Sequence, residues 1–145
     1  MKEFPIRPLI IDDYKAMIAL WEKAGLTHRP KGRDAKEEVT TQLKRDDLRI
    51  LGMFDGENLI GTILCSSDGR RGWINRLAVD PDYRRQGISQ KLIEACEDFL
   101  RALGLKVIAA LIEDYNEASI AAFTKAGYLY GQDIMYFSKR TSWDD

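Results

Sequence analysis

The fold of this chain is decided by Trp73-Ile74-Asn75-Arg76-Leu77-Ala78-Val79-Asp80-Pro81, followed by Asp82-Tyr83-Arg84-Arg85-Gln86-Gly87-Ile88-Ser89 and a helical run that ends at Gly104. This order predicts an apolar strand, a hard turn, a loop with arginine and glycine, and an amphipathic helix. A loop that leads into a helix presents unpaired backbone N–H groups at the positive end of the helix dipole. We therefore expect an anion site between Val79 and Gln90, best suited to a phosphate.

The bulk properties favour one domain over residues 1–145, which is large enough to bury a single core. The chain has 145 residues, with 22 basic and 23 acidic side chains and a net charge of −1. A dedicated nucleic-acid binder would normally show a basic excess, so no nucleic-acid partner is expected. No apolar run approaches the length of a membrane span, and no secretory signal precedes the domain, so no membrane role is expected either.

Two cysteines, Cys65 and Cys96, lie far apart along the chain without metal-type spacing. Core filling by reduced thiols in a cytoplasmic protein is the simplest interpretation. His28 is the single histidine and falls in a polar loop, which excludes other His-dependent triads and HExxH metal sites. We expect no metal.

Outside the central stretch, local signals predict helices, strands and turns. A helix follows Asp12 and Asp13 and stops at Gly25, and a more polar helix covers about 34–45. Runs 48–54 and 58–65 flank a strong turn signal. The almost uniformly apolar run 107–112 predicts a central strand covered on both faces. Asn116 can cap a short helix that stops at Gly127, and 128–130 and 134–138 are typical of two closing strands. The resulting class is mixed α/β.

In the expected strand over 73–79, side chains should alternate between the two faces of the sheet. This alternation predicts Trp73, Asn75, Leu77 and Val79 on one face, and Ile74, Arg76 and Ala78 on the other.

Two common phosphate sites are excluded by the glycine pattern. No pair of glycines has the G-x-G spacing of the dinucleotide fingerprint. No Gly-Lys-Ser/Thr follows the loop, so a P-loop for nucleoside triphosphates is excluded as well.

The segment Arg84-Arg85-Gln86-Gly87-Ile88-Ser89, after Leu77-Ala78-Val79-Asp80-Pro81, resembles motif A of the Gcn5-related N-acetyltransferases, Arg/Gln-x-x-Gly-x-Gly/Ala. Downstream, Asn116-Glu117-Ala118-Ser119 through Phe123-Thr124-Lys125-Ala126-Gly127-Tyr128 is similar to motif B. The resemblance covers nearly the whole chain. It implies a mostly antiparallel central sheet of about six to seven strands, splayed between strands 4 and 5 and flanked by about four helices.

The resemblance also implies an acetyl-CoA pocket. The pantetheine arm would pair with the backbone of the strand that contains Leu77, as a peptide pairs with a sheet edge. Gly87 would let the main chain approach the pyrophosphate because it lacks a Cβ. The residues implied as the cofactor site are Leu77, Ala78, Val79, Arg84, Arg85, Gln86, Gly87, Ile88, Ser89, Gln90, Asn116 and Phe123.

Three positions depart from the family pattern. Ser89 stands where Gly or Ala is usual, which is a mild change because serine can cap a helix or donate to a phosphate. Phe123 replaces the tyrosine that protonates the leaving thiolate in many members, and Leu111 occupies the position of a general base in some relatives. We therefore consider Glu113 as the substitute base and Tyr115 as the substitute acid, against the alternatives of a solvated strand end and a packing residue.

The function expected from these residues is transfer of an acetyl group from acetyl-CoA, by direct attack, to a primary amine of a small molecule or a peptide N-terminus. A non-catalytic acyl-CoA-binding module or sensor is the alternative, favoured by Phe123 and Leu111. The identity of the amine is not encoded in the motifs, because variable loops would build its site. A homodimer through the final strands is also compatible with the sequence.

Overall fold

A hairpin lies at the centre of the sheet in the computed structural model, which describes residues 3–145. Strands β2 (Leu48–Asp55) and β3 (Asn58–Ser67) pair antiparallel around Gly56, whose φ of +61° suits the tight turn. Strand β1 (Ile6–Pro8) pairs antiparallel with β2, and β4 (Gly72–Val79) pairs antiparallel with β3. Strand β5 (Ile108–Ala110) joins β4 in parallel, so the spatial order is β1-β2-β3-β4-β5.

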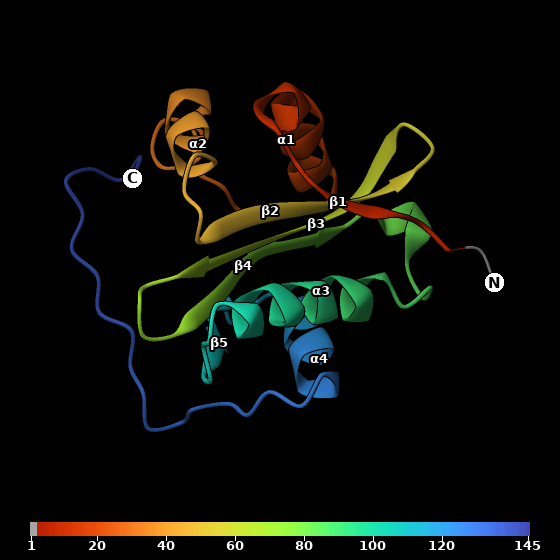
Figure 1. Cartoon of the computed structure of the whole chain (residues 1–145). Helices are drawn as coiled ribbons and strands as arrows, with labels where there is room; N and C mark the ends of the chain where they lie inside the picture. The colour runs from red at the N-terminus through yellow and green to blue at the C-terminus, as the bar shows by residue number, and fades with distance from the viewer. Residues whose placement is uncertain (1–2) are drawn as a thin grey trace.

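Four α-helices of the described chain cover the two faces of this sheet (Figure 1). Helices α1 (Tyr14–Lys23) and α2 (Lys36–Gln42) lie on one face. Helices α3 (Ile88–Ala102) and α4 (Glu117–Lys125) lie on the other. Short 3₁₀ turns, η1 (Ile11–Asp13) and η2 (Pro81–Tyr83), precede α1 and follow β4. Each face has its own apolar core, one centred on Trp21 of α1 and the other on Leu92, Cys96 and Leu100 of α3. The predicted mixed α/β class is therefore confirmed.

Cys65 and Cys96 are free and fully buried, as the sequence predicted. They are distant in sequence, yet both lie in the core where α3 packs on β3, and burial raises the pKa of the Cys96 thiol. A thiol held protonated in this way is a poor nucleophile.

The two predicted closing strands are not formed. Residues 128–130 and 134–138 have no strand structure, so the described chain has five strands and the predicted six to seven is not confirmed. Strand β5 is also shorter than predicted and lies at the sheet edge with half-buried residues, which corrects the expectation of a central strand. The reason is pairing: high β propensity alone does not make a strand when no neighbour supplies the ladder of hydrogen bonds.

A β-bulge interrupts β4 at Arg76. Thr62 pairs with Ala78 and Leu64 pairs with Asn75, so one residue of β3 faces two of β4. Arg76 has a φ of +55° at this point. The extra residue reverses the side-chain alternation that follows it.

The predicted faces of this strand are therefore wrong beyond the bulge. Leu77 lies in the same core as Ile74, under α3, whereas Ala78 joins the core under α1. Regular alternation had placed Leu77 with Trp73 and Asn75, because it assumed no inserted residue.

The register of β4 against β5 also shows where these two strands separate. Their parallel pairing runs from Gly72 and Ile108 to Ile74 and Ala110, while β4 continues to Val79. The predicted splay between strands 4 and 5 thus begins directly at the bulge. Beyond it, the edge of β4 that would face β5 has no strand neighbour within the described chain.

Neither a membrane span nor a metal cluster is present in residues 3–145. No helix there combines the length and apolar character required to cross a bilayer. No group of three or more His, Cys, Asp or Glu side chains is gathered there in a way that could hold a metal ion.

Candidate active site

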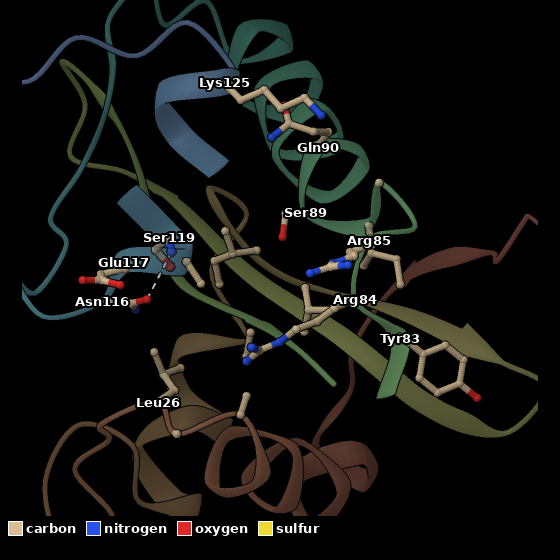
Figure 2. Close-up of a pocket in the computed structure, with 18 of the residues that line it drawn as sticks. Leu26, Tyr83, Arg84, Arg85, Ser89, Gln90, Asn116, Glu117, Ser119 and Lys125 are labelled. Atoms are coloured by element: carbon tan, nitrogen blue, oxygen red, sulfur yellow. Dashed lines mark hydrogen bonds between the residues drawn. The ribbon is translucent and has the colours of Figure 1, made fainter. Parts of the chain in front are cut away.

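A cavity of about 450 Å³ lies where the splayed half of β4 meets the first turns of α3 and α4. Figure 2 shows this cavity in close-up, with Leu26, from the segment that follows α1, on its lower side. Its walls are the edge of β4, the loop before α3, and the N-terminal turn of α4. We call it the donor cavity. It is lined by Ala24, Gly25, Leu26, Leu77, Ala78, Val79, Tyr83, Arg84, Arg85, Gly87, Ile88, Ser89, Gln90, Tyr115, Asn116, Glu117, Ala118, Ser119 and Lys125.

The loop into α3 has the conformation that its glycine predicts. Gly87 is the N-cap residue with a φ of +73°, and no side chain caps the helix. Arg85 also has a positive φ, of 64°. The N–H groups of the first helical turn therefore face the cavity mouth without an intrahelical acceptor, at the positive end of a 15-residue helix.

The start of this loop is fixed by an ionic cluster. The Asp80 carboxylate accepts the Asp82 N–H at 2.9 Å, and Lys23 Nζ lies 3.0 Å from Asp80 and 3.1 Å from Asp82. Burial of Asp80 acts against ionisation, but the Asp82 N–H and the Lys23 ammonium outweigh it and lower the pKa of Asp80. The carboxylate stays charged and ties the end of β4 to α1.

Two arginines and a serine point from the loop into the donor cavity. Figure 2 shows Arg84 and Arg85 extending across it, with the Ser89 hydroxyl directed inward from the first turn of α3. Gln90 is turned differently: its side chain donates to the Ala122 carbonyl at 2.9 Å and joins α3 to α4. Tyr83 points to the other side of the loop and donates to Asp55 at 2.7 Å. The two guanidinium groups and the positive end of the α3 dipole thus lie at the same cavity.

A second cavity, of about 560 Å³, continues from the first on the side of α2 and β5. We call it the acceptor cavity. It is lined by Gly25, Leu26, Thr27, Arg33, Gln42, Leu48, Leu64, Ile74, Asn75, Arg76, Leu77, Leu111, Ile112, Glu113, Tyr115, Asn116, Ser119, Phe123, Tyr136 and Arg140. The residues common to both cavities mark their junction: Gly25, Leu26, Leu77, Tyr115, Asn116 and Ser119.

The segment between β5 and α4 carries polar groups to this junction. The Asn116 side chain caps α4 by accepting the Ser119 N–H at 3.1 Å, as the sequence predicted. Tyr115 lines both cavities, and its hydroxyl shares a 2.5 Å hydrogen bond with the Thr27 hydroxyl. Glu113 lines the acceptor cavity only. The phenol and the amide thus lie where the two cavities meet, and the carboxylate lies in the wall of the acceptor cavity.

Two of the three positions that depart from the family pattern, Leu111 and Phe123, line the acceptor cavity. Leu111 is half exposed there. Phe123 is 4 % exposed and packs edge-to-face against Tyr128, with ring centroids 5.1 Å apart. The Tyr128 hydroxyl does not face the junction, since it donates to Glu97 of α3 at 2.8 Å.

The structure therefore gathers nearly all of the predicted site residues. Gln86 is the exception among them, because it lines neither cavity. Sequence reasoning missed the contributions of Leu26, Lys125 and Glu117 to the donor cavity and of Arg76 to the acceptor cavity. For Lys125 and Glu117 a signal was available, because both lie in the motif B segment.

Comparison with known proteins identifies the family of the chain that folds in this way. Residues 12–128 match the model of the acetyltransferase (GNAT) family. The chain belongs to this family of enzymes.

Curated relatives support the assignment in sequence. Acetyltransferase SG1711 of Sodalis glossinidius is 34 % identical over 136 residues, covering 93 % of this chain and 94 % of the relative. Acetyltransferase ECA0875 of Pectobacterium atrosepticum is 35 % identical over 118 residues, covering 81 % and 82 %.

Solved structures agree in fold. The PaiA N-acetyltransferase of Thermoplasma acidophilum, in complex with coenzyme A, has a TM-score of 0.76 and 20 % identity over 86 % of this chain and 89 % of its own. The aminoglycoside acetyltransferase AAC(6')-Iy, in complex with the bisubstrate analogue CoA-S-monomethyl-acetylneamine, has a TM-score of 0.78 and 17 % identity over 96 % and 99 %. At this identity the likeness concerns the fold.

Proposed function

We propose that this chain is an acetyl-CoA-dependent N-acetyltransferase that passes an acetyl group by direct attack to a primary amine, on a small molecule or a peptide N-terminus. The observation that carries the proposal is the meeting of two cavities. One has an anion site at its mouth, the other is open to a second molecule, and they share a lining at Leu77, Tyr115 and Asn116. Direct transfer requires this kind of contact between donor and acceptor.

The donor cavity fits coenzyme A. The free N–H groups after Gly87, with Arg84, Arg85 and the Ser89 hydroxyl, suit a pyrophosphate. The unpaired edge of β4 at 77–79 suits the amides of the pantetheine arm. Ala78, Ile88 and Gln90 complete the lining, and we leave Gln86 out of the proposed site because it does not reach the cavity.

Acetyl-CoA supplies an activated thioester, and the chain supplies position and proton transfer. In the proposed reaction Glu113 takes a proton from the amine, whose nitrogen bonds to the acetyl carbon as the carbon–sulfur bond breaks. Tyr115 gives its proton to the departing thiolate. Both side chains line the acceptor cavity, and Tyr115 also lies at the junction. Asn116 keeps the first turn of α4 in place through its cap, and Phe123 forms part of the apolar wall.

A non-catalytic acyl-CoA-binding module is the second candidate. It is favoured by Phe123, which is buried against Tyr128 and has no proton to give. Two measurements separate the candidates. Calorimetric titration with acetyl-CoA, with desulfo-CoA and ATP as controls, tests the donor cavity. Amine-dependent release of CoA thiol tests transfer. Binding of acetyl-CoA without any amine-dependent release of thiol would favour the non-catalytic binding module. Absence of acetyl-CoA binding would exclude both candidate functions.

We also propose that two copies of the chain associate through the C-terminal segment. Large apolar side chains are exposed along it: Leu129, Tyr130, Ile134, Met135, Tyr136, Phe137 and Trp143. Figure 1 shows this segment running past the sheet edge toward α2, away from β5. The outer edge of β5 is unpaired within the described residues, so residues 128–138 of a second copy can add a strand there.

Light scattering tests the association by mass, with twice 16.6 kDa expected. Charged substitutions at Leu129 and Phe137 should return the mass of one chain. A single-chain mass for the unsubstituted protein would contradict the dimer.

For the location of the protein we propose the cytoplasm, since its two thiols are free.

A further inference from the structure

The acceptor cavity has a wall rich in arginine. Among its lining residues, all in the described part of the chain, the arginines are Arg33, Arg76 and Arg140, and the one acidic residue is Glu113. Glu113 lies in the segment before α4, whereas Arg33 and Arg76 come from the loop before α2 and from the β4 bulge. The negative charge of the cavity wall and its positive charges therefore come from different segments of the chain.

The three guanidinium groups are not equivalent. Arg76 is satisfied inside the protein: it donates to the Asp34 carboxylate at 2.6 Å and to the Thr27 carbonyl at 2.8 Å. Arg140 donates to the Asp145 carbonyl at 2.8 Å. Arg33 forms no ion pair and no side-chain hydrogen bond within residues 3–145, although its carbonyl accepts from Gln42 at 2.8 Å. Its guanidinium is exposed and available to a ligand.

The charge of Arg33 is also felt at Arg76. Burial lowers the pKa of Arg76, Asp34 opposes this, and the positive charges of Arg33 and Arg29 add to the lowering. The basic groups thus lie close enough to repel one another, and an anion between them would relieve that repulsion. Neutral hydrogen-bonding side chains, Gln42 and Asn75, line the same part of the cavity.

We propose that the acceptor amine carries a carboxylate, and that Arg33 binds this carboxylate at the end of the cavity remote from the thioester. The inference rests on the proposed function and names the substrate class of the same site. An amino acid or short peptide with a free carboxyl end has the required polarity: its amine faces Glu113 and its carboxylate faces Arg33. A polyamine would bring positive charge to a guanidinium that lacks a counter-ion, so neamine, whose derivative occupies the AAC(6')-Iy complex, should be a poor acceptor.

The test compares acceptors that differ only in this charge. Release of CoA thiol is measured at saturating acetyl-CoA with amino acids and dipeptides, with the same compounds as C-terminal amides, and with neamine. We expect kcat/KM for the best acid to exceed that of its amide by about tenfold or more, since a hydrogen bond to a charged group contributes on that order. Equal or higher values for the amides or for neamine would overturn the inference.

Arg33→Glu tests the residue. It should lower kcat/KM for the acid about tenfold, chiefly through KM, and leave the amide nearly unchanged, so the acid-to-amide ratio collapses. Arg70→Glu, at an arginine in the β3–β4 turn, is the matched control and should not alter the ratio. A ratio unchanged in Arg33→Glu would remove Arg33 from the site.

The same assay separates this inference from the proposed function. Turnover of amides or neamine without a preference for acids overturns only the substrate class. If no acceptor of either series releases thiol above the background, the substrate class is overturned too, and calorimetry with acetyl-CoA then decides whether the donor cavity still stands.

Discussion

Arg76 and Asp34 form a buried ion pair, with Arg76 Nη2 lying 2.6 Å from Asp34 Oδ2 and side chains only 15 % and 6 % exposed. The pair joins the β4 bulge to the loop before α2. The same carboxylate accepts the Arg29 N–H at 2.6 Å, and Arg76 also stacks over Trp21 with its guanidinium carbon 5.4 Å from the ring centroid. The bulge lies where β4 and β5 separate, and the loop before α2 lines both cavities at Gly25 and Leu26. The Arg76–Asp34 pair therefore fixes the bulge and this loop relative to each other.

Asp34→Ala should lower the free energy of unfolding by about 3–5 kcal/mol, because it leaves a buried guanidinium without its counter-ion. Urea denaturation measures the loss. Asp46→Ala is the control: Asp46 is exposed, its side chain has no partner within residues 3–145, and its removal should cost less than about 0.5 kcal/mol. A loss below about 1 kcal/mol for Asp34→Ala would mean that water or another group compensates Arg76.

Asp68 makes the stability depend on acid pH. Its carboxylate accepts from Trp73 Nε1 at 3.0 Å and from the N–H groups of Arg71 and Arg70, both at 2.7 Å, and these bonds lower the pKa of Asp68 to about 2. The unfolded chain has a value of about 3.9. Since the folded pKa is the lower one, the contribution is complete above pH ~4 and is lost as the pH falls toward 2. Asp68→Asn should therefore be less stable than the unsubstituted protein at pH 6, with the gap closing near pH 2. A gap that does not vary with pH would contradict this assignment.

Gly87→Glu should abolish binding of acetyl-CoA while the fold persists. A Cβ at Gly87 would meet no atom within 4 Å, so the cost to the fold is limited to the strain of a side chain at a φ of +73°, about 1–2 kcal/mol. The added carboxylate would lie where the pyrophosphate is proposed to bind.

Gly69→Glu separates strain from charge. Gly69 has a φ of +87° and an equally open Cβ position, but it lies in the β3–β4 turn and lines neither cavity. Both variants should lose similar stability in thermal unfolding, and only Gly87→Glu should lose calorimetric binding. Normal binding by Gly87→Glu would refute the anion site at α3.

Local signals in the sequence predicted the elements that need only near neighbours. The Asp55-Gly56 turn, the Asn116 cap and the glycine before α3 each depend on a few adjacent residues, and each was confirmed. The donor cavity follows from them, because it is built mainly from one continuous stretch and the start of α4.

What the sequence did not reveal depends on pairing between distant residues. The bulge at Arg76 appears only in the register of β4 against β3, so regular alternation placed Leu77 on the wrong face. The segments 128–130 and 134–138 have strand composition but no partner strand. The basic wall of the acceptor cavity joins Arg33, Arg76 and Arg140, which no local pattern relates.

Phe123→Tyr should leave the transfer rate unchanged or raise it, because a hydroxyl on a ring that lines the acceptor cavity can supply the proton that Phe123 lacks. Release of CoA thiol under saturating acetyl-CoA measures the rate. Tyr128→Phe is the control on the other ring of the edge-to-face pair. It removes only the bond to Glu97, so about 1 kcal/mol of stability should be lost with the rate retained. A collapse of the rate in Phe123→Tyr would show that the ring is needed for packing.

Glu113→Gln should lower the transfer rate at neutral pH by about 10²-fold or more if Glu113 is the general base, because an amide cannot take the proton of the amine. The shape of the pH–rate profile should also change. Asp114→Asn removes a neighbouring carboxylate that lines neither cavity, and it should change neither the rate nor the profile. Glu113 is exposed, and its one described hydrogen bond is to its carbonyl, from the Asn116 N–H at 3.0 Å, so a change of its side chain should not unfold the protein. An unaltered profile in Glu113→Gln would therefore exclude Glu113 as the base. Solvent would then accept the proton, and the rate would depend on the proximity of the two substrates at the junction.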